Sequence, residues 1–251
     1  MITLITTSYN REIVLKHAMD SVLNQRFTDY EYLVIDGGSS DGTCELLREY
    51  EKKFSGRLKW ISEKDNGIYD AINKGIKLSH GNIVGILNSD DFFHRDDALE
   101  IVARGFTDQS IDAIYADCII LRNKNGIEKH FLKSNAFFKN WMFRIGIMPS
   151  HGTFYAKKSL FEKYGVYKTN YKITADFELM LRFMYINKIN THYINESLFT
   201  FSDGGVSSHW SNKIKLNAET TQSCKDNGLF CCLPMIWMKY LFKLKKILFQ
   251  I

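Results

Sequence analysis

Two adjacent carboxylates, Asp90 and Asp91, follow a short apolar run over residues 83–87. The run contains β-branched residues and predicts a strand that is buried on both faces. In open α/β sheets, ligands bind beyond the carboxyl ends of the strands, so acids placed there point toward a site. Neighbouring carboxylates repel each other, and a divalent cation allows both to stay ionised. We therefore expect Asp90 and Asp91 to bind a metal ion, with a polar turn capped by Asp91 as the alternative.

The first half of the chain alternates between expected strands and expected helices. The strands are expected at residues 2–6, 31–35, 59–62 and 83–87. Apolar residues at helical spacing follow each of the first three strands. This alternation predicts a Rossmann-like α/β fold with a mainly parallel central sheet flanked by helices. The polar loops that end at Asn10, Asp41 and Asp91 would then meet at one edge of the sheet.

The second half of the chain has a less regular pattern. Residues 113–116 are expected to add a strand, and residues 118–131 to form a hairpin with its turn at residues 124–126. Asp176 and Glu178 are expected to open an apolar helix. The loop at residues 202–210 is rich in glycine and serine and predicts an irregular segment.

The length, cysteine content and charge of the chain narrow the kinds of protein that it could be. With 251 residues, 45% of them hydrophobic, the chain has enough apolar material for one sizeable core. Its five cysteines include no CxxC pair, which favours a reducing cytosol over a disulfide framework or a zinc site. The first residues read as a strand, so no signal peptide is expected. The net charge of +5 is modest, and no nucleic-acid partner is expected.

The polar loops together offer what a nucleoside diphosphate requires. Such a ligand needs an aromatic ring for its base, a carboxylate or amide for the polar edge of the base, and a cation for its two phosphates. The sequence has no GxxxxGK[ST] loop and no GxGxxG after the first strand, so neither a P-loop nor a dinucleotide fold is supported. Gly38 stands where an aspartyl phosphatase would need a second acid.

Several segments give the chain a resemblance to glycosyltransferase family 2 enzymes with a GT-A fold, of the bacterial polysaccharide-assembly type. The order and spacing of these segments carry the resemblance. They are TTSYNR (6–11), SVLNQRFTDYEYLVIDGGSSDGT (21–43), EKDNGIYDAINKGI (63–76), GNIVGILNSDD (81–91), PSHGTFY (149–155) and ADFELMLR (175–182). The resemblance implies an inverting, metal-dependent hexosyl- or N-acetylhexosaminyltransferase that uses Mg or Mn. The expected donor is a nucleotide sugar, namely a UDP-sugar.

The resemblance also implies roles for individual residues of the first half. The nucleotide-binding residues would be Thr6, Tyr9, Asp36, Tyr69, Asn73 and Asp90. Asp91 would bind the metal, and Asp90 would share the metal or the ribose. Asn73 has a capping or packing role as an equal alternative. Asn88 replaces the first acid of the family's commonest DxD motif, which leaves one fewer charge near the cation.

Asp176 occupies the place of the family's catalytic base, which takes the proton from the acceptor hydroxyl. A position at the start of a helix is expected to favour its ionised form. The alternative is that Asp176 only caps the helix. Glu178 is a second candidate for the base and is also a candidate for contact with the acceptor or the diphosphate. His151 and His209 are candidates for contact with the diphosphate or the acceptor, and a structural role explains His151 equally well.

The end of the chain carries the basic character. No acid follows Asp226, and four lysines lie beyond it, at 239, 243, 245 and 246. The apolar run at residues 229–238 is too short to span a bilayer. Leu241, Leu244 and Leu248 share one helical face with the lysines on another, which predicts an amphipathic helix on a membrane surface or, alternatively, one that packs on protein.

The expected organisation is one catalytic domain over residues 1–227 and a tail over residues 228–251. Residues 1–117 would form the nucleotide-binding half, and residues 118–227 the acceptor-side half. The expected protein is cytoplasmic and peripheral on the inner face of the plasma membrane, and it extends a lipid-linked glycan for a cell-surface polysaccharide. The alternatives are a sugar nucleotidyltransferase and a non-catalytic, membrane-tethered nucleotide-binding subunit. The sequence is silent on the oligomeric state.

Overall fold

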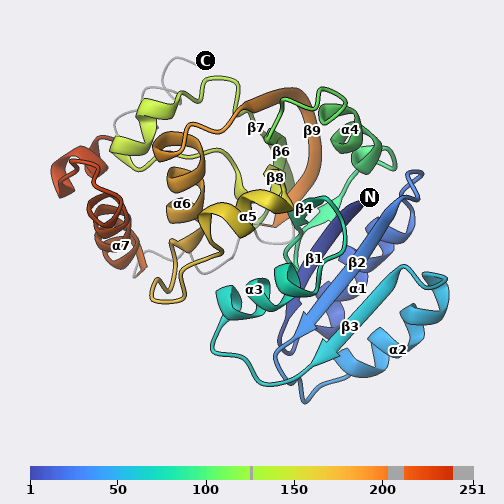
Figure 1. The fold of residues 1–251 in the computed structure, drawn as a ribbon. Coiled ribbons are helices and arrows are strands. Elements are labelled where there is room, and N and C mark those ends of the chain that lie inside the picture. The colour runs from blue at the N-terminus through green and yellow to red at the C-terminus, as the bar shows by residue number, and fades with distance from the viewer. Residues whose placement is uncertain (125–126, 203–211, 240–251) are drawn as a thin grey trace.

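One curled, mixed sheet runs through the molecule and carries helices on both faces (Figure 1). The structure is a computed structural model that describes residues 1–124, 127–202 and 212–239. Within these residues the sheet has nine strands in the order β3-β2-β1-β4-β8-β6-β9-β5, with β7 paired to β6 outside this path.

The first four strands of the chain form the parallel part of the sheet. They are β1 (Ile2–Ser8), β2 (Tyr30–Asp36), β3 (Leu58–Ser62) and β4 (Ile83–Ile86). The crossover helices are α1 (Glu12–Leu23), α2 (Thr43–Lys53) and α3 (Ile68–Leu78). Strand β1 lies between β2 and β4, and all three pairings in this part are parallel. The alternation expected from the sequence is therefore confirmed, with element ends that shift by a few residues.

The other strands make the rest of the sheet mixed. They are β5 (Phe92–Phe93), β6 (Ala113–Lys124), β7 (Ile127–Lys133), β8 (Tyr155–Lys157) and β9 (Thr191–Ser202). Strand β8 is antiparallel to both β4 and β6, whereas β6 and β9 are parallel. The strand expected at 113–116 and the first arm of the expected hairpin are one continuous strand, β6, with irregular pairing to β9 between Ala116 and Cys118. The hairpin itself is confirmed by the antiparallel β6–β7 pairing.

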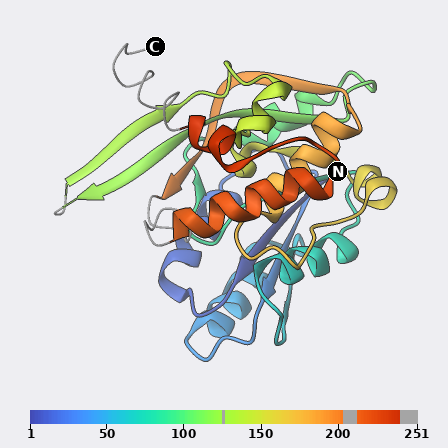
Figure 2. The same ribbon diagram turned by 90° about the vertical axis from the view of Figure 1, so that its left-hand side faces the viewer.

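The remaining helices all follow β5 in the chain. They are α4 (Ala98–Gly105), α5 (Lys158–Tyr164), α6 (Ala175–Met180) and α7 (Asn212–Asp226), with 3-10 turns η1 (Asn140–Ile145) and η2 (His151–Thr153) and a π-helical segment η3 (Leu181–Ile186). The helix expected from Asp176 onward is confirmed, because α6 begins at Ala175 and passes directly into η3. In Figure 2, α7 crosses in front of the body of the molecule.

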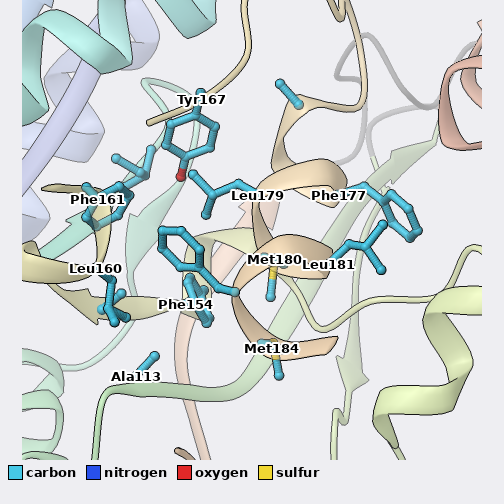
Figure 3. Packing of buried hydrophobic residues seen from close by; sticks show 14 of the residues in the cluster. Ala113, Phe154, Leu160, Phe161, Tyr167, Phe177, Leu179, Met180, Leu181 and Met184 are labelled. Carbon is cyan, nitrogen blue, oxygen red and sulfur yellow. The ribbon is translucent and has the colours of Figure 1, made fainter. Parts of the chain in front are cut away.

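Two clusters of buried apolar side chains cover the two faces of the sheet. One cluster combines α3 with α5, α6 and η3, and the other combines α1, α2 and α4. Figure 3 shows part of the first cluster, where Phe161 and Leu179 lie beside Tyr167. Burying an aromatic or leucine side chain contributes about 1.5–3 kcal/mol. These contacts hold the start of α6 against the sheet.

The first part of the tail packs on the same cluster. Leu229, Cys231 and Ile236 are buried in it, and residues 233–239 are helical. The packing alternative therefore describes the tail up to residue 239. The expected amphipathic helix depends on Leu241, Leu244 and Leu248, which lie outside the described residues. Within the described parts of the chain, every helix is too short or too polar to cross a bilayer.

Candidate active site

A cavity of about 640 Å³ opens at the carboxyl ends of β1 and β4. The end of β1 contributes Thr7, Ser8 and Tyr9 to its wall, and the loop after β4 contributes Asn88, Ser89 and Asp90. Other parts of the wall come from η2, from the loop before α6 and from Asp176. The acids that the sequence singled out after β4 and at the start of α6 therefore line one cavity, as expected from the meeting of loops at this edge.

Asp90 and Asp91 occupy different depths at the end of β4. Asp90 lines the cavity, whereas Asp91 is almost completely buried. The amide Nδ2 of Asn88 donates to Asp91 Oδ2 over 2.8 Å, and the backbone N–H of Ser202 donates to Oδ1 over 3.2 Å. Burial, together with the nearby charge of Asp90, raises the pKa of Asp91 to about 7. The uncompensated burial of a carboxylate so close to a second one is what a bound cation would offset.

The donor atoms at this place suit a hard divalent cation. Asp90, Asp91 and Asn88 all offer oxygen, which Mg²⁺ and Mn²⁺ prefer. Within the described residues, no group of three or more His, Cys, Asp or Glu side chains is gathered closely enough to hold a metal. His209, a candidate for contact with the diphosphate or the acceptor, lies outside the described residues. The oxygen chemistry of these three side chains is compatible with such a cation.

Asp176 lies in the first turn of α6 and keeps some accessible surface at the cavity. The backbone N–H of Phe177 donates to its Oδ1 over 2.7 Å. Burial raises the pKa of Asp176, and both His151 and the backbone hydrogen bonds act against this rise. The expectation that the helix start would favour the ionised form is therefore wrong in its net effect, because burial outweighs the backbone contribution. A carboxylate with a raised pKa is a stronger base than an ordinary aspartate.

His151, on η2, lies beside Asp176 at the cavity wall. Its Nε2 is 2.7 Å from the hydroxyl of Tyr167. Burial lowers the pKa of His151, while the Asp176 carboxylate acts in the opposite direction. His151 thus has a structural partner in Tyr167 and also lines the cavity. Its position is compatible both with a structural role and with contact with the diphosphate or the acceptor.

Two tyrosines expected near the donor also line the cavity. Tyr9 lies at its mouth with 62% of its surface exposed. Tyr69 donates from its hydroxyl to the backbone carbonyl of Ile173 over 2.8 Å, and its ring stacks on Tyr167 with centroids 5.9 Å apart. An exposed ring such as that of Tyr9 is suited to stacking on a planar base. Tyr69 instead holds the loop that leads into α6.

Thr6 and Asp36 are placed by the structure behind the cavity wall. Thr6 is buried, and its Oγ1 donates to the carbonyl of Leu87 over 2.6 Å. Asp36 is also buried, and its carboxylate accepts from the N–H groups of Gly38 and Ser39 and from Ser62 Oγ. Neither side chain lines the cavity. Their observed contacts shape the loops after β1 and β2, and Thr7 takes the place on the wall that the sequence assigned to Thr6.

Asn73 exchanges two hydrogen bonds with the backbone of a single residue. Its Nδ2 donates to the carbonyl of Tyr167 over 2.8 Å, and its Oδ1 accepts from the N–H of the same residue over 3.0 Å. Both ends of the amide are therefore engaged with the chain itself, outside the main cavity. The packing alternative describes Asn73, and a donor-binding role for it is not supported by its position.

Glu178 is fully buried on the far side of α6 from the cavity and is paired with cations. Its carboxylate lies 2.9 Å from Arg182 Nη2 and 2.8 Å from Lys168 Nζ. Burial alone would raise the pKa of Glu178, but these partners lower it below its ordinary value. The proposal of Glu178 as a second base or acceptor ligand is wrong, because two residues along a helix point away from Asp176.

Charged residues that sequence reasoning missed also line the cavity. They are Arg11, Asp65, Lys133 and Lys172. Arg11 and Asp65 lie in the segments TTSYNR and EKDNGIYDAINKGI, which carry the family resemblance. Their nearness in sequence to residues with an expected role could have indicated that they also line the site. Lys133 and Lys172 lie in segments without a motif, and only the fold brings them to the wall.

Residues 3–205 match the family model described as Glycosyl transferase family 2. A PGL/p-HBAD biosynthesis glycosyltransferase of Mycobacterium bovis is 28% identical over 210 residues, which cover 82% of this chain and 79% of the relative. A fragment of TarS from S. aureus in complex with UDP-GlcNAc superposes with a TM-score of 0.68 at 16% identity, over 88% of this chain and 66% of the fragment. A mannosyltransferase from Pyrobaculum calidifontis in complex with GDP-Man and Mn²⁺ gives 0.67 at 16% identity, over 88% and 64%.

Proposed function

We propose that this chain transfers a sugar with inversion from a nucleoside diphosphate donor to a glycan acceptor. The premise is that the chain belongs to glycosyl transferase family 2 and has the GT-A fold. The observation that carries this proposal is the shared cavity of Asp90 and Asp176. An inverting displacement needs a site for the leaving diphosphate and a base on the opposite side of the anomeric carbon. These two acids come from different elements and line the same cavity, which supports one acid for each need.

The donor would occupy the side of the cavity formed by β1 and β4. Tyr9 would stack on the base, and Asp90 would bind the ribose or the cation. The TarS fragment was solved with UDP-GlcNAc and the archaeal mannosyltransferase with GDP-Man, which supports a nucleotide sugar as the donor here. The donor that we propose is a UDP-sugar, in line with the UDP-GlcNAc of the TarS complex.

Mg²⁺ or Mn²⁺ would be held by Asp90 and Asp91, and when bound it would neutralise charge on the leaving diphosphate. Asn88 and the Ser202 N–H, which donate to the carboxylate of Asp91, would hold its orientation. Asn88 itself carries no charge, so Asp90 and Asp91 supply the two negative charges of this ligand set. The Mn²⁺ in the complex of the archaeal mannosyltransferase supports the choice of metal.

Asp176 would act as the base. Its carboxylate would take the proton of an acceptor hydroxyl as that oxygen forms a bond to the anomeric carbon. The bond from this carbon to the diphosphate oxygen breaks at the same time, and the electron pair leaves with the diphosphate. His151, held by Tyr167, would fix the cavity wall beside Asp176 and contact the acceptor or the diphosphate.

The acceptor would be a lipid-linked glycan at the cytoplasmic membrane surface, extended for a cell-surface polysaccharide. Lys243, Lys245 and Lys246 of the tail support this placement, since lysines favour an anionic surface. Exposed apolar side chains precede these lysines in the chain, at Phe230, Leu233, Trp237 and Met238. A basic and apolar segment of this kind suits the interface of a membrane.

The experiment that tests the proposal is a thermal-shift screen of nucleotide sugars with and without Mn²⁺. Ligand at about 100 times its Kd stabilises by about 2.7 kcal/mol, which raises the Tm of a chain this size by roughly 5 °C or more. We expect one UDP-sugar to give this shift with Mn²⁺ and Asp90→Ala to lose it. Asp108→Ala, an exposed acid outside the cavity, is the control. If no nucleotide sugar shifts the Tm, the proposal is wrong. An assay of donor hydrolysis then separates an enzyme, which cleaves the bound donor, from a subunit that only binds it.

A further inference from the structure

The β6–β7 hairpin projects from the body of the molecule as a long arm (Figure 2). Its base forms part of the cavity wall, because Cys118 and Ile120 on β6 and Lys133 on β7 all line the cavity. The register pairs Cys118 with Lys133, Ile120 with Phe131 and Arg122 with Lys129. Opposed residues of an antiparallel pair share a face, and so do alternate residues of one strand. These six residues therefore form one continuous surface, which we call the cavity face of the arm.

The inner part of the cavity face is apolar. Ile120 lies between Phe131 on β7 and Phe201 on β9, with which it is also in register. Phe201 lines the cavity, and Phe131 is 43% exposed on the arm. The three side chains form a row across three strands at the point where the arm leaves the cavity. Such a row offers a flat surface to the apolar face of a sugar ring.

The outer part of the cavity face is cationic. Arg122 and Lys129 are both exposed and form the next cross-strand pair outward from Ile120 and Phe131. The Arg122 guanidinium lies over the Phe131 ring, 5.2 Å from its centroid. Lys133 adds a third positive charge at the cavity end, and none of the six residues is acidic. The opposite face of the arm carries Glu128, so the positive charge belongs to the cavity face.

We propose that the cavity face of the arm binds an acidic glycan chain, the part of the acceptor that extends away from the reacting hydroxyl. This inference rests on the proposed function, because the hydroxyl must lie at Asp176 while the rest of the acceptor leaves the cavity. A sugar ring lies on the apolar row, and a carboxylate further along the glycan lies at Arg122 and Lys129. The two rows are about 7 Å apart, the length of two residues of a strand. Continuity with the cavity favours a glycan over a membrane lipid as the ligand.

The proposal is tested by titrating the full chain with pentagalacturonate and with maltopentaose in a calorimeter. The two probes have equal numbers of rings, and only the first is charged. We expect the acidic probe to bind more tightly and its affinity to fall with added salt, because exposed charges are screened. Arg122→Gln and Lys129→Gln should each weaken it two- to fivefold, the size expected for one exposed ion pair. Phe131→Ser should weaken both probes.

Two matched controls separate this site from general charge. His130→Gln changes the opposite face of the arm, and Lys52→Gln removes a positive charge on α2. Both should bind pentagalacturonate as the unsubstituted chain does. The proposal is overturned if pentagalacturonate does not bind, if the arm variants bind it normally, or if they instead lose binding to vesicles of phosphatidylcholine and phosphatidylglycerol. Thermal shift by the nucleotide sugar should persist in the arm variants, so failure of this inference is distinguishable from failure of the proposed function.

Discussion

Glu219 on α7 accepts a hydrogen bond of 2.8 Å from the backbone N–H of Ile173, and so ties α7 to the loop that precedes Asp176. The N–H groups of Lys172 and Thr174 donate to the same carboxylate. Tyr69 holds the other side of this loop by donating to the carbonyl of Ile173. The start of α6 is therefore fixed from two elements that lie far from it in the sequence.

We expect Glu219→Ala to lower the free energy of unfolding by about 2 kcal/mol, because several backbone donors lose a charged acceptor. Glu219→Gln keeps an oxygen acceptor and should lose less. Urea unfolding followed by circular dichroism measures both variants. Lys215→Ala, an exposed change on the same helix, is the control. Equal stability of Glu219→Ala and the unsubstituted chain would show that the carboxylate does not hold the loop.

Asp176→Asn should leave donor affinity unchanged and suppress transfer. Removal of a general base typically costs about 10²- to 10⁴-fold in rate. Calorimetry with the nucleotide sugar measures the first quantity, and initial rates of transfer measure the second. Transfer at a near-normal rate would assign the base to another residue.

Glu178→Gln is the matched contrast, since Glu178 is an acid two residues away that faces away from the cavity. This change removes the negative charge between Arg182 and Lys168. Loss of one member of a buried ion pair costs about 3 kcal/mol or more. We expect a large loss of stability in urea and, under conditions where the variant is folded, a rate of transfer within a few-fold of the original. A rate as low as that of Asp176→Asn would contradict the structural role of Glu178.

The parts of this molecule that the sequence could predict are those governed by local pattern. Parallel strand ends meet at one edge, so the convergence of the loops that carry Tyr9 and Asp90 followed from the alternation of strands and helices. Alternation along β1 sends only one of Thr6 and Thr7 to the cavity, and no local pattern identifies which. The partners of Asp36 and Glu178 include Ser62 and Asn227, which only the folded chain brings near. The positions of Asp36 and Glu178 therefore depend on contacts between residues far apart in the sequence, which no local pattern predicts.

The raised pKa of Asp176 predicts how stability depends on pH. The unfolded chain releases this proton near pH 3.9, whereas the folded chain retains it to higher pH. Between the two pKa values the folded state binds more protons, so the contribution of Asp176 to stability is present below the unfolded pKa and is lost as pH rises. We therefore expect Asp176→Asn to be more stable than the unsubstituted chain at pH 7, with a difference that vanishes near pH 3–4. Urea unfolding across this range measures it, and a difference independent of pH would contradict the burial of this carboxyl.

Two truncations separate the packing of the tail from its proposed binding to membranes. Removal of residues 228–251 also removes Leu229, Cys231 and Ile236 from the core. We expect this shorter chain to lose several kcal/mol of stability, at about 2 kcal/mol for each large buried side chain. The division of this shorter chain between membrane and soluble fractions would therefore depend on its folding as well as on its binding to membranes.

Removal of residues 240–251 leaves these core contacts in place and deletes Lys243, Lys245 and Lys246. Each lysine near an anionic surface contributes about 1 kcal/mol to binding. We expect this truncation to keep the Tm of the full chain and to release the protein from vesicles that contain phosphatidylglycerol, with neutral vesicles as the control. Charge reversal of the three lysines to glutamate should reproduce the release. Undiminished sedimentation with anionic vesicles after both changes would show that this segment does not attach the enzyme to membranes.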